Sequence, residues 1–307
     1  MDTARFKSFA ADFGRACGRF FRALGIKIVN IFKTLYSNPK SAVGFSVILF
    51  FVVLAVIVAP LLNYTGLTDP LHVFESPSAE HWLGTDSLGR DVLSMLIVGT
   101  GDVLTVAFLT AVVTVIFGTV VGIVSGLLGG AVDKVIQTIT NLFLTIPSFP
   151  VLMLLSALIT VEDNVTFALI LSIWNWPGLC RAVRSQIISL KERDFIQICT
   201  VMKMSRLHII LRELLPNISS YIFINFVMIM KNAIIASVGI MMMGVAAYDP
   251  TNWGAMLYDI MNNAAMHIDS AIAYVIAPIL FIVLLQFGII MLANGLDEKL
   301  NPRLRRN

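Results

Sequence analysis

The chain alternates between long apolar runs and polar segments. Three runs carry no charged residue and are long enough to cross a bilayer: Ala42–Leu62, Val103–Leu128 and Ala271–Asn294. A hydrocarbon core about 30 Å thick needs roughly 20 apolar residues in helical form. Because lipid offers the backbone no hydrogen-bond partners, each run is predicted to be a transmembrane helix.

Three further runs are apolar but less uniform. Val135–Val161 begins with polar residues and contains two prolines, Val165–Cys180 is short but can extend through Arg181–Leu190, and Ile218–Tyr248 carries one charge, Lys231. Counting these runs as spans predicts an all-α membrane protein with six transmembrane helices. The expected organisation is a cytoplasmic lead (1–40), a first span (41–63), an extracytoplasmic loop (64–100), a five-helix core (101–295) that contains the loop 181–216, and a cytoplasmic basic tail (296–307).

The basic residues predict the orientation of these spans. All of the 22 Lys and Arg residues except Arg90 and Lys231 fall in segments that six spans place on one side of the membrane. Cytoplasmic loops carry such an excess of basic residues. Both termini are therefore expected in the cytoplasm, with the acidic loops outside.

The lead 1–40 has a helical pattern of its own. Phe6, Phe9, Phe13 and Phe20 recur on one face, and arginines lie mostly off that face. This pattern predicts an amphipathic helix in the cytoplasmic interface. Two roles stay open for it, as an anchor for the first span or as a regulatory or partner-docking element.

Composition narrows the class of protein. Hydrophobic residues make up 57% of the 307 residues and charged residues 13%, with a mean hydropathy of +0.85. A soluble domain carries about 25% charged residues, so a soluble enzyme, a disordered chain and a coiled coil are excluded. The net charge of +3 gives no support to a nucleic-acid partner, and three cysteines suggest no disulfide framework.

The segment Gly84–Asp91 imitates a phosphate-binding loop but lacks the Lys and Ser/Thr that must follow the second glycine. It also lies in the predicted outside loop, so we reject nucleotide binding there. The four histidines are scattered, and we predict neither a catalytic nor a metal site. We expect Arg90 to pair with Asp86 or Asp91 in a structural role.

The inside segment Arg181–Asn217 is long, mixed in charge and apolar at helical intervals. Ile196, Cys199, Met202 and Leu207 are expected to share one face, and Pro216 is expected to begin the fifth helix. Long loops in compact domains are usually functional. We therefore interpret the segment as a docking surface for a cytoplasmic partner, with a linker lying on the membrane as the alternative.

Polar residues inside the predicted spans are candidates for a substrate path. Lys231 and Asn232 lie near the middle of one span, where a charge is costly unless it faces a cavity or a partner. A structural pair with a neighbouring helix is an equal alternative. Trp174 and Asn175 are weaker candidates for lining a cavity.

Several motifs resemble one family. His81–Leu93 resembles the outside-loop signature of the C-type permease subunit of dipeptide and oligopeptide ABC importers. Further segments match this family in the same order along nearly the whole chain: Ser37–Lys40, Ala59–Leu62, Leu190–Phe195, Leu215–Asn217, Asn252–Leu257 and Leu300–Arg305.

The resemblance implies a type I ABC importer permease in a bacterial inner membrane. It implies a heterodimer with a second, homologous permease, two cytoplasmic ATPases that bind ATP and Mg, and an external substrate-binding protein. The chain itself would then hold no cofactor and catalyse nothing. Nickel complexes or oligosaccharides are alternative cargoes, and an ion channel or a membrane-embedded enzyme is a remote alternative.

The resemblance also assigns roles to residues. The outside signature, taken as structural, comprises Gly84, Thr85, Asp86, Gly89, Arg90 and Asp91. The loop that couples ATP hydrolysis to the spans would comprise Asp194, Phe195, Gln197, Ile198, Cys199, Lys203, Leu207, Leu215 and Pro216.

This chain departs from the family pattern within that loop. Gln197 replaces a glutamate, Ile198 and Cys199 replace two alanines, and Lys203 replaces a glycine. Glycine permits a turn with positive φ. The departures predict altered docking geometry, matched by a divergent ATPase.

Overall fold

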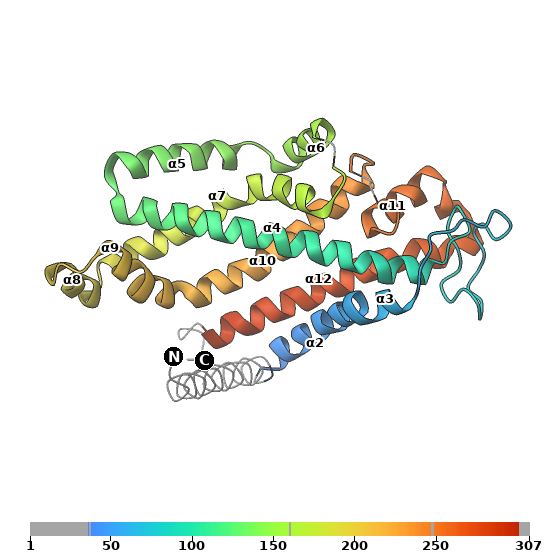
Figure 1. Ribbon diagram of the computed structural model, residues 1–307, viewed down its shortest axis with the longest axis horizontal. Coiled ribbons are helices and arrows are strands. Elements are labelled where there is room, and N and C mark those ends of the chain that lie inside the picture. The colour runs from blue at the N-terminus through green and yellow to red at the C-terminus, as the bar shows by residue number, and fades with distance from the viewer. Residues whose placement is uncertain (1–35, 37, 160, 247–248, 301–307) are drawn as a thin grey trace, which may run out of the picture.

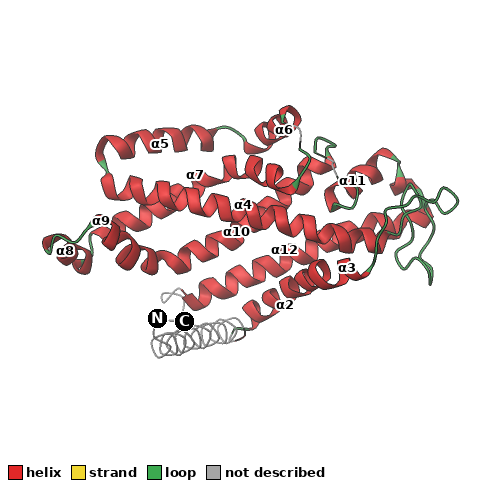
Figure 2. Ribbon diagram, viewed as in Figure 1, coloured by secondary structure: helices red, strands yellow, loops and turns green. Residues whose placement is uncertain are grey.

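A computed structural model describes residues 36, 38–159, 161–246 and 249–300. Every regular element in these ranges is a helix (Figures 1 and 2). The predicted amphipathic helix in the lead 1–40 lies almost wholly outside the described residues, as does the tail from residue 301. The all-α architecture is confirmed for the described part of the chain.

The first span is a helix with a wider turn near its end. Helix α2, Pro39–Val53, begins at Asn38, whose side chain accepts a 2.9 Å hydrogen bond from the Lys40 backbone N–H. A π-helical turn η1, Leu54–Val58, then leads into α3, Ala59–Leu61. Pro60 lies two residues after this turn. Since a proline ring clashes with the carbonyl four residues earlier, the wider turn lets the helix continue.

A second π-helical turn corrects the predicted role of Pro216. The residue lies in the first turn of α10, but the helical run has already begun at Arg206 and passes through η2, Ile209–Leu214, without a break. Pro216 therefore does not start the helix. The wider turn before it again accommodates the proline ring.

Helix α4 is central in the bundle and packs against both α7 and α10, while α2 packs against α12. Close approach depends on glycine, because a Cβ atom at Gly44 would lie 2.2 Å from the Leu292 backbone nitrogen. Such small residues are common where transmembrane helices meet. The remaining elements are α4 Val92–Leu128, α5 Gly130–Thr145, α6 Ser148–Leu158, α7 Asn164–Lys191, α8 Asp194–Val201, α9 Arg206–His208, α10 Leu215–Met242, α11 Trp253–Asn262, η3 Ala265–His267, η4 Asp269–Ala271 and α12 Ile272–Leu300.

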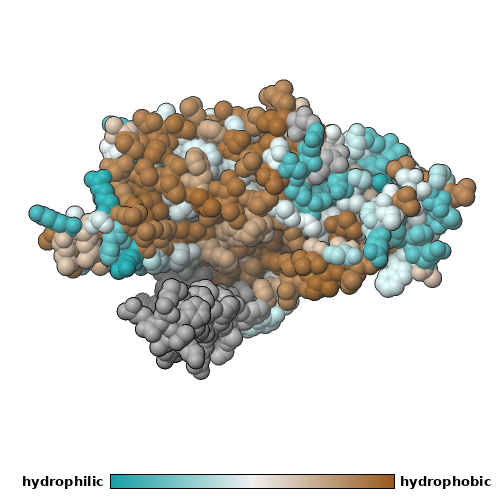
Figure 3. Space-filling view, viewed as in Figure 1, coloured by the Kyte–Doolittle hydropathy of each residue, from teal (hydrophilic) through white to brown (hydrophobic). Residues whose placement is uncertain are grey.

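Four helical runs in the described residues are long and apolar enough to cross a bilayer: Pro39–Leu61, Val92–Leu128, Arg206–Met242 and Asp269–Lys299. Helices α5 and α6 together make a fifth if the bent pair counts as one span. Helix α7 contains the predicted run Val165–Cys180 but is not among them, so the six-span count stays a prediction. Figure 3 shows a broad hydrophobic band between more hydrophilic ends, as expected of a membrane protein.

The predicted span Val135–Val161 is bent in the structure. Helix α5 ends at Thr145, α6 begins at Ser148, and the two axes meet at 87°. Pro147 explains the break, because a residue before proline is disfavoured in helical conformation. Ile146 is accordingly extended, with φ −82° and ψ 130°.

Two predicted boundaries also differ from the structure. Helix α4 begins at Val92, inside the predicted loop 64–100, because the Asp91 side chain caps it. Helix α12 reaches Leu300, which lies beyond the predicted core boundary at 295. Helix α7 continues to Lys191, in agreement with the expected extension of its run through Arg181–Leu190.

The two ends of the bundle are distinct. Lys40 and Glu298 form an ion pair at 3.1 Å, which brings the start of α2 and the end of α12 together. Figure 1 places α8 and α9 toward this end and the loop between α3 and α4 at the opposite end. The predicted coupling loop and the predicted signature loop therefore lie at opposite ends.

Candidate functional site

The coupling segment, residues 192–208, projects from the bundle between α7 and α10 (Figure 1). Within it, α8 begins with Asp194 in its first turn, where a carboxylate is favourable near the positive end of the helix dipole. Its inner side chains, Ile196 and Cys199, are buried in a cluster with residues of α4, α7 and α10. Helix α8 is thus fixed to the bundle by one apolar face.

The outer face of α8 is apolar as well, although it is exposed. Ile198 is 57% exposed and Val201 is 82% exposed. Exposed large apolar side chains so close together are typical of a surface that a partner or lipid covers. We call Phe195, Ile198, Val201, Met202 and Leu207 the docking face.

The prediction that Met202 and Leu207 share one face with Ile196 and Cys199 is wrong. Both side chains are exposed. Helix α8 ends at Val201, and the chain then turns, so helical spacing no longer relates residues before and after the turn. Two more of the predicted coupling residues have different surroundings. Gln197 is exposed and donates a 3.2 Å hydrogen bond to the Glu192 carbonyl. Leu215 packs against the apolar cluster that contains Ile196 and Cys199.

The turn after α8 keeps the geometry that the family's glycine would supply. Lys203 adopts φ +54°, and its N–H donates a 3.0 Å hydrogen bond to the Thr200 carbonyl. A second hydrogen bond runs from the Met204 N–H to the Cys199 carbonyl, and the two bonds together form a Schellman motif. Replacement of glycine by Lys203 has therefore left the backbone turn in place.

Three of the four predicted pathway residues line one cavity of about 430 Å³. Trp174 and Asn175 come from α7, Asn232 comes from α10, and the bend between α5 and α6 supplies the opposite wall. The Trp174 ring packs on Phe143 at a centroid distance of 4.9 Å. The lining thus combines amide groups with aromatic surface and carries no charged side chain.

Lys231, the fourth predicted residue, does not line this cavity. Its backbone carbonyl accepts a 3.1 Å hydrogen bond from Gln286 of α12, and its side chain is half-buried. Consecutive residues on a helix point about 100° apart, and of these two only Asn232 lines the cavity.

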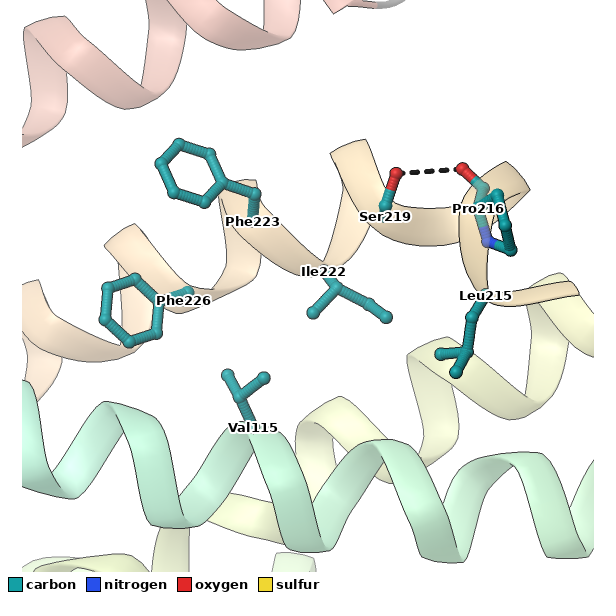
Figure 4. A pocket seen from close by; sticks show the side chains of 7 residues that line it. All are labelled: Val115, Leu215, Pro216, Ser219, Ile222, Phe223 and Phe226. Atoms are coloured by element: carbon teal, nitrogen blue, oxygen red, sulfur yellow. Dashed lines mark hydrogen bonds between the residues drawn. The ribbon is translucent and has the colours of Figure 1, made fainter. Parts of the chain in front are cut away.

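A second cavity, of about 480 Å³, lies between α4 and α10 (Figure 4). Ile222, Phe223 and Phe226 of α10 line it together with Val115 of α4. Its Ser219 hydroxyl already donates to the Pro216 carbonyl at 2.8 Å. This groove therefore offers apolar contact and little hydrogen bonding, unlike the cavity at Asn232.

The signature loop at the other end is built around a buried ion pair. Asp86 is fully buried, and its carboxylate accepts a 2.7 Å bond from Arg90 Nε and a 2.5 Å bond from Arg90 Nη2. Burial acts to lower the pKa of Arg90, but the hydrogen bond to Asp86, the Asp86 charge and the nearby Tyr64 and Tyr274 together raise it. The predicted pairing of Arg90 with Asp86 is found, and Asp91 instead caps α4 and contacts His81 at 3.1 Å.

The other signature residues shape the same loop. The Thr85 hydroxyl accepts a 2.8 Å hydrogen bond from the Glu75 N–H, and Gly84 and Gly89 both adopt positive φ. Ser87 donates to Asp259 of α11 at 2.8 Å, and Tyr274 donates to the same carboxylate at 2.9 Å. The loop is thus a folded cap joined to α11 and α12.

Comparison with known proteins identifies the family of this chain. Residues 118–306 match the family model of the binding-protein-dependent transport system inner membrane component. The chain belongs to this family. The resemblance predicted from the sequence is therefore confirmed, and the chain is a transport permease.

Three relatives of this permease are informative. A dipeptide transport system permease protein of Alkalihalophilus pseudofirmus is 33% identical over 278 residues, 89% of each chain. A glutathione transport system permease protein of Shigella flexneri is 34% identical over 83% of this chain and 85% of its own length. An oligopeptide transport system permease protein of Bacillus subtilis is 25% identical over 88% of each chain.

One feature of the permease escaped the sequence analysis. Asp133, at the start of α5, accepts 2.6 and 2.5 Å bonds from Arg184 of α7 and a bond from Ser125 of α4. This bidentate pair ties three helices together beside the coupling segment. The partners are separated by 51 residues, so sequence spacing gives no indication that they pair. The sequence offered only an acidic residue in a segment expected on the basic, inside face.

Among the described residues, no three His, Cys, Asp or Glu side chains are grouped to hold a metal ion.

Proposed function

We propose that this permease is the translocation subunit of an ATP-driven ABC importer of short peptides in a bacterial inner membrane. The observation that carries the proposal is the docking face, an exposed apolar surface on a helix whose other face is packed into the bundle. Its relatives are named as dipeptide, glutathione and oligopeptide transport permeases, which supports peptides as cargo.

The partners follow from this role. We propose a heterodimer with a second, homologous permease, two cytoplasmic ATPases and an external substrate-binding protein. ATP and Mg²⁺ would bind to the ATPases, so that this chain takes no part in hydrolysis. In this proposal the chain has six spans and both termini are cytoplasmic, which would put the docking face on the ATPase side and the signature loop outside.

Movement would pass from the docking face to the cavity by rigid packing. A displacement of α8 is transmitted through Ile196 and Cys199 to the cluster shared by α4, α7 and α10. Helices α7 and α10 carry Trp174, Asn175 and Asn232. Rocking of these helices would open the cavity to each side in turn, which is alternating access.

The cavity suits a peptide backbone. The Asn232 amide has both donors and an acceptor for peptide groups, and Trp174 offers an aromatic surface. The Asn175 amide already donates to the Leu171 carbonyl at 2.7 Å, which fixes its orientation. Without a charged lining residue, the cavity selects weakly among side chains, and the external binding protein would set specificity.

The docking face is tested by purifying the complex from cells that express the permease with the proteins encoded beside it. Val201→Glu places a charge on the docking face, and we expect the ATPases no longer to co-purify. Leu67→Glu is the matched control, because Leu67 is 77% exposed at the opposite end. Retention of the ATPases by Val201→Glu would overturn the proposed coupling role.

The cargo is tested by uptake. Asn232→Leu should lower the uptake of labelled dipeptides and tripeptides, while the neighbouring Lys231→Met should leave it near normal. Uptake of nickel complexes or oligosaccharides, but not of peptides, by the intact system would replace the peptide assignment.

A further inference from the structure

A third cavity, of about 420 Å³, lies between the end of α4 and the coupling segment. Apart from Thr200 and two basic residues, every side chain that lines it is aliphatic or methionine. Val124 and Leu128 of α4 form one wall, and Ile196 of α8 and Ile210 of η2 belong to the other. The cavity is therefore an apolar groove between a membrane helix and the coupling segment.

The two basic residues of this groove are Lys191 and Arg206. Both are exposed, and the Lys191 ammonium donates to the Leu127 carbonyl at 3.1 Å. Within the described ranges, neither forms an ion pair with a carboxylate. Two positive charges thus accompany an apolar groove without a matching negative charge.

The position of the groove indicates what can reach it. Val124 and Leu128 belong to a run that can cross the membrane, and they are 37% and 48% exposed. The apolar run ends at Leu128, and a bilayer edge at this end of the run would put the groove at the depth of the lipid headgroups. A lipid can enter from the bilayer with its acyl chain against Val124 and its headgroup beside the basic residues.

We propose that this groove binds an anionic phospholipid of the cytoplasmic leaflet. The apolar walls match an acyl chain, and Lys191 and Arg206 match an anionic headgroup. A soluble anion would leave the apolar walls unused. A zwitterionic phospholipid would bring no net charge to the two cations.

The lipid would also fill the space between α4 and α8. Ile196 and Thr200 are on α8, the helix that carries the docking face. A bound lipid would therefore stiffen the connection between the docking face and the bundle. This consequence rests on the proposed function, whereas lipid binding itself does not.

The test measures lipid retention by the purified permease. The protein is reconstituted in nanodiscs with phosphatidylglycerol or phosphatidylcholine, released, and examined by native mass spectrometry for bound lipid. We expect wild type to retain phosphatidylglycerol in preference to phosphatidylcholine. Lys191→Gln with Arg206→Gln should weaken that retention roughly tenfold or more, since each basic residue contributes to the attraction of anionic lipid.

The matched control is Arg193→Gln with Arg212→Gln, which removes two exposed charges, one from the coupling segment and one from η2, that do not line the groove. This variant should retain phosphatidylglycerol like wild type. Thr200→Trp, which fills the groove and keeps both charges, should also lose the lipid. Equal retention of the two lipids by wild type, or unchanged retention by the Lys191/Arg206 variant, would overturn the proposal.

ATPase binding is scored separately by co-purification. A permease that retains the anionic lipid but binds no ATPase would overturn the proposed function and leave the lipid site standing. Loss of ATPase binding in the Lys191/Arg206 variant, with lipid retention unchanged, would instead assign the two charges to ATPase docking.

Discussion

The Met204 backbone N–H donates a 3.1 Å hydrogen bond to the Cys199 carbonyl and closes the turn at the end of α8. This bond requires the intervening Lys203 to adopt a left-handed conformation, with φ +54°. A residue with a Cβ atom is strained there. The coupling segment therefore stores strain where a glycine would store none.

Lys203→Gly should relieve this strain. We expect the purified permease to gain about 1 kcal/mol of stability, measured as a higher midpoint of thermal unfolding in detergent. Lys203→Ala removes the charge but keeps the Cβ atom, so it should give no such gain. Equal stabilisation by the two variants would assign the effect to charge instead of backbone conformation.

The buried pair of Asp86 and Arg90 should be essential to the signature loop. Asp86→Asn leaves the Arg90 guanidinium buried beside a neutral amide, and removing one partner of a buried pair costs about 3 kcal/mol or more. We expect limited proteolysis to cut the loop between α3 and α4 much faster in this variant. Glu80→Gln, a change at an exposed residue of the same loop, should leave the cleavage rate unchanged.

Gly89 should not tolerate a side chain. Its φ is +77°, and a Cβ atom would lie 1.9 Å from the Asp69 carbonyl oxygen. Gly89→Ala must therefore displace backbone and should sharply reduce the yield of folded protein in size-exclusion chromatography. Gly66→Ala has a similar φ of +67° but meets only the Tyr64 ring at 3.7 Å. The control should show strain alone, about 1 kcal/mol, and a near-normal yield.

The signature loop should respond to pH through His72. Its Nδ1 lies 2.7 Å from the Asp69 carboxylate, and this hydrogen bond raises the pKa of His72 and lowers the pKa of Asp69. The stabilisation from His72 is complete below its unfolded pKa of about 6.5 and disappears as pH rises through the raised value. The stabilisation from Asp69 is present above about pH 4 and disappears as pH falls through the lowered value.

Amide hydrogen exchange around residues 69–75, corrected for intrinsic rates, should therefore be slower at about pH 5.5 than at about pH 8.5. Both side chains are about half exposed, so the difference should be small. His72→Gln should remove it. A pH difference that persists in this variant would exclude His72 as its source.

Periodicity and charge were sufficient to predict the helical class and most of the membrane runs. Uniform apolar runs such as Val103–Leu128 are determined by the solvent around them, so their prediction needs no tertiary information. The bend at Pro147 was not predicted, since hydropathy carries no information about the direction of a helix axis. The proline itself indicated a break, because the residue before it, Ile146, is disfavoured in helical conformation.

Other parts of the site depend on contacts that sequence spacing does not reveal. Asp133 and Arg184 meet only because α5 folds back against α7. The exposed positions of Met202 and Leu207 depend on the turn at Lys203, where the helical period is interrupted. By contrast, Trp174, Asn175 and Asn232 could be nominated as polar or aromatic residues in apolar runs, although nothing in the sequence separates Asn232 from Lys231 in role.

The π-helical turn η2 has a consequence for how the two ends are aligned. It lies between the coupling segment and α10, and a π turn holds more residues than an α turn. It therefore sets the rotation of α8 and α9 about the axis of α10. Each residue inserted or deleted there would turn the docking face by about 100° relative to Asn232. The permease would keep both the docking face and the cavity at Asn232, but a displacement of the docking face would no longer be directed toward that cavity.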